Sequence, residues 1–344
     1  MKAFRWTVER AGFTVVQDLG RPGHAWLGVA VNGASDHRSA RTANALVGNA
    51  DDAPLLEVTA SDLVVRTEAD CLVAVTGAVV DVAVDSCAAP VHQPLVLRAG
   101  SSLTVPSPAT GLRSYVAVNG GIEGERHLGS VAPDPLLGVG HRLAAGDEVR
   151  VRTAYLRSEH RQHLPLYRFG TTPPAVGARH RVAVLPGLDL ARMAEPDQLL
   201  DTLVVQPQSD HVGLRLDRPD GGPIAQHDAA PILSRGVPVG AVELPGTGGF
   251  IVLLRGRLLT AGYPVVAVVG SAHLDQLGQA RPGDELLLSL TDADSERAAV
   301  RRWEDAHHRI AERVRRAFAT TGIGHLVDPA HGQPARTTPE ELTT

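Results

Sequence analysis

The chain has 344 residues, 43% of them hydrophobic, and a formal net charge of −5 at pH 7. Its length suffices for two ordinary domains, and its apolar content supports a folded core. The net negative charge argues against a nucleic-acid binder. No apolar run approaches membrane-spanning length and the N-terminus lacks a signal-peptide hydrophobic region, so we expect a cytoplasmic protein without membrane contact.

Three residue types narrow the chemistry. Lys2 is the single lysine, which excludes a classical P-loop ATPase and leaves anion binding to arginine or backbone N–H groups. Cys71 and Cys87 lack a CxxC spacing and are interpreted as small buried hydrophobic residues. The fifteen histidines form no HExxH or HxH motif, so we expect no metal site.

Short valine-rich segments separated by Gly, Asp and Pro predict a mostly β fold in both halves of the chain. In the N-terminal half they are typified by residues 63–66, 71–75 and 79–84. The pattern returns in the second half at residues 181–185, 203–205, 240–244, 250–254 and 265–269. Residues 155–176, rich in Arg, His and Pro, are expected to form the linker between the halves.

Helices are expected at only three places. Asp36 can cap a helix that ends near Val47, and Ser271 can begin a short one. The clearest helix is predicted near the C-terminus, where one apolar stripe has helical spacing: Trp303, His307, Ile310, Val314 and Phe318. We therefore divide the chain into an N-terminal unit (1–170), a second unit (171–291), a C-terminal helix (292–322) and a disordered tail (323–344).

A weak internal repeat relates three segments: 97–105, 143–151 and 280–288. Each has a turn, then Gly-Asp or Gly-Ser, then an alternating strand. The repeat is consistent with a related β-barrel in each half. The alternative is that Gly-Asp is simply a common way to enter a strand.

The densest cluster of candidate binding residues begins at Gln17-Asp18-Leu19-Gly20-Arg21 and continues to Asn32-Gly33. Polar side chains between glycine turns are typical of a site for a small polar molecule. Arg21 could bind an anionic group while Gln17 and Asp18 hydrogen-bond an amide. Alternatively, Asp18 and Arg21 could close the turn as a local ion pair.

Asp36 and the asparagines after it are open to two interpretations. As an N-cap, Asp36 needs no further explanation, although the helix N-terminus is also a natural anion site. Asn49 is expected to satisfy backbone groups, and Asn44, in the middle of the helix, could point into a cleft.

Two motifs of the second half carry further candidates. Ser209-Asp210-His211 is not a hydrolytic triad, because neighbours in an extended strand point to opposite faces, and no GxSxG motif is present. In Thr260-Ala261-Gly262-Tyr263-Pro264, the Tyr263 ring could stack on a flat ligand, or pack in the core instead. A positive φ at Ala261 would be strained.

These segments, with Tyr115–Gly121 and Leu56–Thr59, resemble the allophanate hydrolase subunit 2 family, also called KipA-like or biotin-dependent carboxyltransferase-like, from about Phe13 to Leu290. The resemblance implies two related cyclophilin-like β-barrel subdomains with few helices. Two positions depart from the family pattern: His211 stands where arginine is usual, and Ala261 where glycine is usual.

The resemblance implies an enzyme component, namely the C subunit of an ATP-dependent 5-oxoprolinase, a hydrolase that opens a cyclic amide. Its partners would be the B subunit, similar to allophanate hydrolase subunit 1, and a separate, third protein, the A subunit. Catalytic residues would be Gln17, Asp18 and Arg21. The small-molecule amide would be bound by Asn32, Gly33, Asp36, Asn44, Glu57, Asn119, Ser209, Asp210, Arg215, Thr260, Gly262, Tyr263 and Pro264.

Two alternatives follow from the same resemblance. One is a carboxyltransferase module that moves CO₂ from carboxybiotin to urea or a related amide, with biotin supplied in trans. The other is a non-enzymatic, KipA-like protein that binds a kinase inhibitor. In that case the C-terminal helix would be suited to form the interface with the inhibitor.

Overall fold

The computed structural model describes residues 2–153, 169, 171, 176–227, 232–246 and 248–333. Strands dominate and helices are few, so the predicted mostly β fold with a C-terminal helix is confirmed. The predicted linker lies almost entirely outside the described residues. None of the described helices is long and apolar enough to span a bilayer.

The first half consists of two antiparallel sheets on one core. The first sheet has the order β11 (Glu148–Thr153), β1 (Lys2–Arg10), β4 (Leu63–Thr67), β9 (Ser102–Val105), β6 (Ala83–Val84), β7 (Cys87–Ala88). The second has the order β2 (Thr14–Gln17), β3 (Leu55–Thr59), β10 (Thr110–Val118), β5 (Cys71–Val79), β8 (Leu95–Leu97). Trp6 and Val65 of the first sheet share a cluster with Val73 and Val116 of the second, because alternate side chains face inward.

The second half is a closed seven-stranded barrel. Its order is β12 (Arg179–Pro186), β19 (Val265–Val269), β16 (Ala241–Glu243), β17 (Phe250–Leu253), β14 (Gly213–Asp217), β13 (Thr202–Val205), β20 (Glu285–Leu290). β12 and β20 pair in parallel and close it. A two-stranded pair, β15 (Arg235–Gly236) with β18 (Thr260–Ala261), lies outside the barrel ladder. The three repeated segments correspond to β9, β11 and β20.

Short helices connect and cover these sheets. α1 (His37–Leu46) packs on the second sheet through a cluster that includes Ala43, Leu46 and Tyr115. α2 (Leu274–Leu277) precedes β20 and has His273 as its N-cap, so the prediction that Ser271 begins this helix was wrong. The 3-10 helices are η1 (Ala25–Leu27), η2 (Leu190–Arg192), η3 (Pro196–Leu200) and η4 (Gly324–Leu326).

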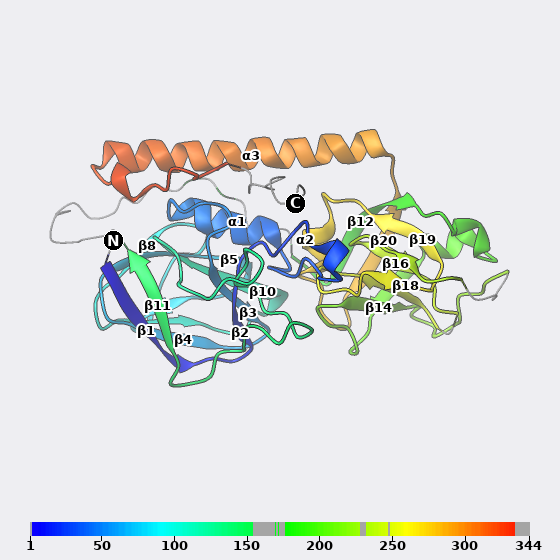
Figure 1. Ribbon diagram of the computed structural model, residues 1–344, viewed down its shortest axis with the longest axis horizontal. Coiled ribbons are helices and arrows are strands. Elements are labelled where there is room, and N and C mark those ends of the chain that lie inside the picture. The colour runs from blue at the N-terminus through cyan, green and yellow to red at the C-terminus, as the bar shows by residue number, and fades with distance from the viewer. Residues whose placement is uncertain are drawn as a thin grey trace.

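The long C-terminal helix α3 (Ala293–Thr320) leaves the barrel and runs back over α1 and the first half (Figure 1). Val314 and Phe318 are buried against the α1 side of the second sheet, as their spacing predicts. Residues 323–333 also pack there, although the sequence predicts a disordered tail from 323. Ile323 and Leu326 are buried, and His331 bonds to the Ala45 carbonyl at 2.9 Å. Residues 334–344 lie outside the described part.

Candidate functional site

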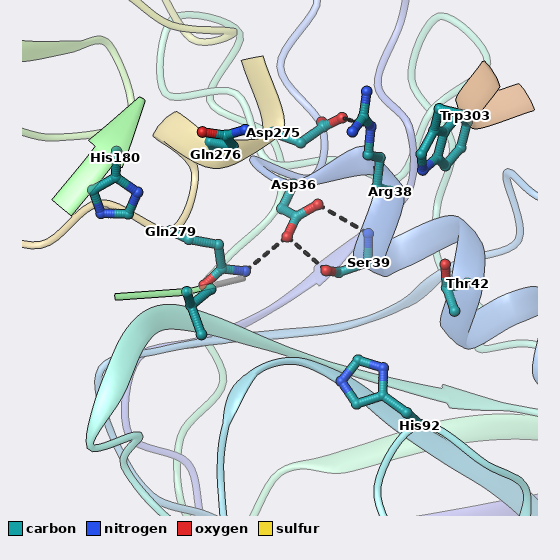
Figure 2. A pocket seen from close by; sticks show the side chains of 11 residues that line it. Asp36, Arg38, Ser39, Thr42, His92, His180, Asp275, Gln276, Gln279 and Trp303 are labelled. Carbon is teal, nitrogen blue, oxygen red and sulfur yellow. Dashed lines mark hydrogen bonds and ion pairs between the residues drawn. The ribbon is translucent and has the colours of Figure 1, made fainter. Parts of the chain in front are cut away.

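A cleft of about 240 Å³ lies where the two halves meet beneath α3. Its polar lining comes from α1, α2, α3, the start of β12 and the loop before β8: Asp36, Arg38, His92, His180, Asp275 and Trp303. Figure 2 shows the Asp36 carboxylate between Ser39 and Gln279. The cleft therefore combines residues from segments that are far apart in the sequence.

Asp36 is the N-cap of α1, as predicted. Its carboxylate accepts hydrogen bonds from the Ser39 backbone N–H at 2.9 Å, the Ser39 hydroxyl at 2.6 Å and Gln279 Nε2 at 2.8 Å. Burial, with a smaller effect from the Asp275 carboxylate, raises the pKa of Asp36 to about 6. Asp36 can therefore change its protonation state near neutral pH.

The charges around Asp36 do not favour an anionic ligand. Asp275 accepts a hydrogen bond from the His37 backbone N–H at 2.8 Å and pairs with both Arg38 and Arg255 at 3.3 Å. The cationic group in the cleft, Arg38, is thus already paired. Burial lowers the pKa of His92, which keeps its ring neutral at pH 7. The lining suits a small neutral ligand and does not fit a triphosphate.

A second hollow, of about 440 Å³, lies between residues 123–150 and Val16. Its lining also has an excess of carboxylates, with Glu123, Glu125, Asp147 and Glu148 against Arg150. Among the described residues, Arg38 of the first hollow is paired with Asp275, whereas Arg150 of the second hollow is exposed and lies among four carboxylates.

The first predicted motif forms a buried cross-link to the loop 127–134. Arg21 is 1% exposed, and its guanidinium donates to the carbonyls of His127 (3.2 Å) and Ala132 and lies 3.5 Å from Asp134. Asp18 accepts from the Ser130 hydroxyl at 2.6 Å and from the Val131 N–H at 2.8 Å. Asn32 donates to Asp134 at 2.8 Å. These contacts position loops, and contact of Arg21 with an anionic substrate stays a prediction.

Comparison with known proteins relates this fold to one family. The profile "Carboxyltransferase domain, subdomain A and B" matches residues 27–289. The chain belongs to the carboxyltransferase domain family. It is 33% identical to the C subunit of 5-oxoprolinase from Escherichia coli (strain K12), over 83% of this chain and 91% of that protein.

Longer proteins contain a similar region. Urea amidolyase of Saccharomyces cerevisiae (strain ATCC 204508 / S288c) is 26% identical over 83% of this chain, but the match spans only 16% of that protein. The crystal structure of TTHA0988 superimposes with a TM-score of 0.73 at 31% identity, covering 83% of this chain and 55% of that one. This carboxyltransferase domain thus spans about half of the solved chain that it matches.

Three other predicted site residues hold the domain's interior together. Glu57 accepts hydrogen bonds from the Ser35 N–H at 2.9 Å and from the Tyr115 hydroxyl at 2.8 Å, and that hydroxyl accepts from the Asp36 N–H at 2.8 Å. Asn44 donates to the Ala53 carbonyl at 2.8 Å. Asn119 donates to the carbonyls of Val47 and Leu326, at 2.8 and 2.9 Å. Asn44 and Asn119 are buried and bond the backbone.

Gly33 has a positive φ of 84°, and a Cβ there would lie 2.5 Å from the Gly20 nitrogen. Only glycine fits where these two turns of the first motif cross. Gln17, at the end of β2, is buried, and its Oε1 has no hydrogen-bond partner among the described residues.

The second-half motifs lie on the barrel. Asp210 Oδ1 accepts from the N–H groups of Val212 (2.8 Å) and Gly213 (3.1 Å), and the Ser209 hydroxyl accepts from the Arg215 N–H at 3.0 Å. Tyr263 is 46% exposed, whereas Pro264 is buried. Thr260 and Gly262 lie just before them.

Ala261 does not have the positive φ that we considered. It lies in β18 with extended backbone, so alanine is accommodated there without strain. This departure from the family pattern therefore leaves the turn intact.

Of the predicted site residues, the structure brings Asp36 and Glu57 together through Tyr115, and Asp18, Arg21 and Asn32 around the 127–134 loop. The second-half motifs form a separate region. Sequence reasoning missed several cleft residues, namely Arg38, His92, His180, Asp275 and Gln279. Gln279 and Asp275 lie in or beside the predicted short helix, but no local pattern marks them as partners of Asp36.

Proposed function

We propose that this chain is the C subunit of an ATP-dependent 5-oxoprolinase complex that opens 5-oxoproline to glutamate. The observation that carries the proposal is the 33% identity to the corresponding 5-oxoprolinase component of E. coli over 91% of that protein. A lactam without ring strain is a poor electrophile, and phosphorylation of its oxygen would create a leaving group. The reaction thus requires a site for a flat amide that bears a carboxylate.

ATP would be held by a partner protein under this proposal. The cleft has two carboxylates and its arginine is paired, so its lining does not fit a triphosphate. We therefore assign this chain to lactam binding and derive no step through ATP here.

Two loops of the first half carry exposed apolar side chains. Trp26 and Leu27 lie on one loop, and Leu136 and Leu137 on another. Arg21 connects the two loops. Its backbone N–H donates to the Val31 carbonyl, and its side chain donates to the His127 carbonyl at the start of the second loop. Grouped exposed apolar residues are typical of interaction sites. We propose that these loops contact the B subunit or the A subunit.

A carboxyltransferase acting on urea is the second candidate, favoured by the family's description and by the similarity to Urea amidolyase. The same fold would then bind two ureido groups, with biotin supplied by a partner.

One assay separates the candidates. The chain is co-purified with its B and A partners, and glutamate release from 5-oxoproline and ATP is measured. Turnover that requires this chain supports the first proposal. An intact complex that leaves 5-oxoproline unchanged, yet carboxylates urea when biotin carrier is added, supports the second.

A further inference from the structure

Glu243 is a buried carboxyl group on the outer face of the barrel. It is 3% exposed, and its Oε1 has no hydrogen-bond partner among the described residues. A buried carboxyl without a partner is destabilising, and an apolar side chain would pack there at lower free energy. The fold by itself gives no reason for this residue.

The position of Glu243 links the two second-half motifs. Val242 and Leu244 face the barrel core, so Glu243 faces outward. In register across the sheet, it pairs with Ile251 on one side and Val265 on the other, and Ile251 pairs in turn with Arg215. Val265 directly follows the Tyr263-Pro264 turn. The row Arg215, Ile251, Glu243, Val265 therefore places Glu243 between β14, which follows the Ser209-Asp210-His211 motif, and β19, which follows the Thr260–Pro264 motif.

A small apolar cluster surrounds this row on the outer face. It includes Val237, Ala241, Leu253 and Val265, with Ile251 packed against it. Val237 follows β15, and Ala261 of β18 also packs on the cluster. The β15–β18 pair thus covers the outer face of the barrel at this cluster. It is short, because only two residue pairs join its strands. A small ligand would need to displace only this short pair to reach Glu243.

A buried cation borders the same cluster. Arg257 is 9% exposed and donates from Nε to the Val237 carbonyl at 3.0 Å, while its Nη1 has no partner among the described residues. No ion pair between Arg257 and Glu243 is present in the described part of the chain. Two buried ionisable groups of opposite sign, each with an unpartnered atom, therefore flank one apolar surface.

These features match a small cyclic amide that carries an anionic group. A neutral carboxyl offers one O–H donor and one carbonyl acceptor side by side, which is the complement of the C=O and N–H edge of a lactam or urea. Burial raises the pKa of Glu243 to about 7, so the neutral form is well populated at physiological pH. A guanidinium suits a carboxylate. Of the two hollows described above, the first has its arginine paired with Asp275, and the second has an exposed arginine among four carboxylates.

We propose that the outer face of the barrel beneath β15–β18 binds the substrate amide, with Glu243 on the lactam edge and Arg257 on the carboxylate. The inference rests on the proposed function for its choice of 5-oxoproline as ligand. Tyr263 is 46% exposed and lies two residues before Val265, so the proposal includes its ring as a contact for the flat amide.

The test is calorimetric titration of the full chain with 5-oxoproline and with 2-pyrrolidinone, the same lactam without the carboxylate. Glu243→Leu should weaken binding of both by roughly tenfold or more, because two hydrogen bonds are lost. Glu243→Gln keeps a donor and an acceptor, so it should bind within about threefold of the wild type. Arg257→Met should weaken binding of 5-oxoproline alone.

The pH dependence gives an independent readout. Wild-type affinity should fall as the pH rises through about 7, where Glu243 loses its donor, and Glu243→Gln should remove this fall. Glu285→Leu is the matched control, because Glu285 is a half-exposed barrel residue paired with Arg179 at 2.7 Å. It should leave both affinities unchanged.

Three outcomes would overturn the site. The first is unchanged lactam affinity in Glu243→Leu, and the second is no binding of either lactam by the wild type at millimolar concentration. The third is loss of lactam binding in Thr42→Phe, a substitution that fills the cleft beside Asp36, while Glu243→Leu still binds. Turnover by the complex separates the two proposals. Turnover unaffected by Glu243→Leu refutes the site and keeps the function, whereas lactam binding at Glu243 without turnover refutes the function and keeps the site.

Discussion

Gln279 connects the barrel to the capping residue of α1. Its Nε2 donates to Asp36 at 2.8 Å and to the Arg113 carbonyl at 3.0 Å, while its Oε1 accepts from the N–H groups of Leu112 and Arg113 at 3.0 Å. One buried amide of the second half thus satisfies four polar groups of the first half. The two halves are held at this joint by directional bonds as well as by apolar packing.

Gln279→Ala should lower the free energy of unfolding by about 2–4 kcal/mol, because it leaves buried donors and acceptors without partners. Urea denaturation measures the change. Gln276→Ala is the matched control, since Gln276 lines the same cleft and is only half-buried. Equal stability of the two variants would show that the joint contributes little.

Asp36 should make stability depend on pH. Its folded-state pKa, about 6, lies above the ordinary value of 3.8, so the folded state favours the protonated form. This contribution is fully present below about pH 4 and is lost as the pH rises through 6, with a total on the order of 2–3 kcal/mol. The free energy of unfolding of wild type minus that of Asp36→Asn should therefore decrease from pH 4 to 7. A flat difference would contradict the buried state of this carboxyl.

Asp51 should anchor α3 to the first half. It lies 2.8 Å from Arg41 Nε and 2.9 Å from His307 Nε2. Burial opposes its charge, but the bonds to His307 and Arg41 outweigh burial and lower the pKa of Asp51. Its contribution is thus present above pH 3.8 and lost as the pH falls through the depressed value.

Asp51→Asn should lower the free energy of unfolding at pH 7 by about 3–5 kcal/mol, because Arg41 and His307 both lose a buried carboxylate partner and Arg41 retains only Glu304. Hydrogen exchange of α3 amides should accelerate in the same variant. Asp305→Asn, exposed on the same helix, is the control and should change neither quantity. Unchanged protection of α3 in Asp51→Asn would disprove the anchor.

Arg21→Met should loosen the loop 127–134 while it preserves the apolar length of the side chain. We expect a loss of about 3 kcal/mol in stability, new protease cleavage in this loop, and failure to co-purify with partner proteins. Arg126→Met, which removes a half-exposed arginine 3.6 Å from Asp18, should have little effect. If Arg21→Met keeps its stability and assembly but no longer binds 5-oxoproline, the role in substrate binding that the sequence predicts would be supported instead.

The two cysteines should differ in reactivity, because Cys71 is buried and Cys87 is exposed. The interpretation of Cys87 as buried was wrong, since β7 is a two-residue strand at the sheet edge. Burial raises the pKa of Cys71 to about 12, which suppresses its thiolate. Mass spectrometry after iodoacetamide treatment of native protein should find one label, absent in Cys87→Ser. Labelling of Cys71 before unfolding would refute this.

Local patterns were enough for the secondary structure. Alternating valines determined the strands, Asp36 determined the start of α1, and the apolar stripe from Trp303 to Phe318 determined how α3 packs. These strands and helices depend on the spacing of residues that are close in the sequence, so local patterns are enough to predict them. The packed segment after α3 was missed, because its few apolar residues, Ile323, Leu326 and Val327, lie among glycines and polar residues without helical or strand periodicity.

The roles of the polar residues were decided only by the tertiary structure. Asp36 and Gln279 are 243 positions apart, and Arg21 meets Ala132 111 positions away. Whether a charged residue is exposed to a ligand or buried among carbonyls depends on which distant segment packs over it. The sequence identified Arg21 as important, but only the fold buries it in a loop joint. Likewise, only the fold leaves Glu243, which no motif marks, without a hydrogen-bond partner for its Oε1 among the described residues.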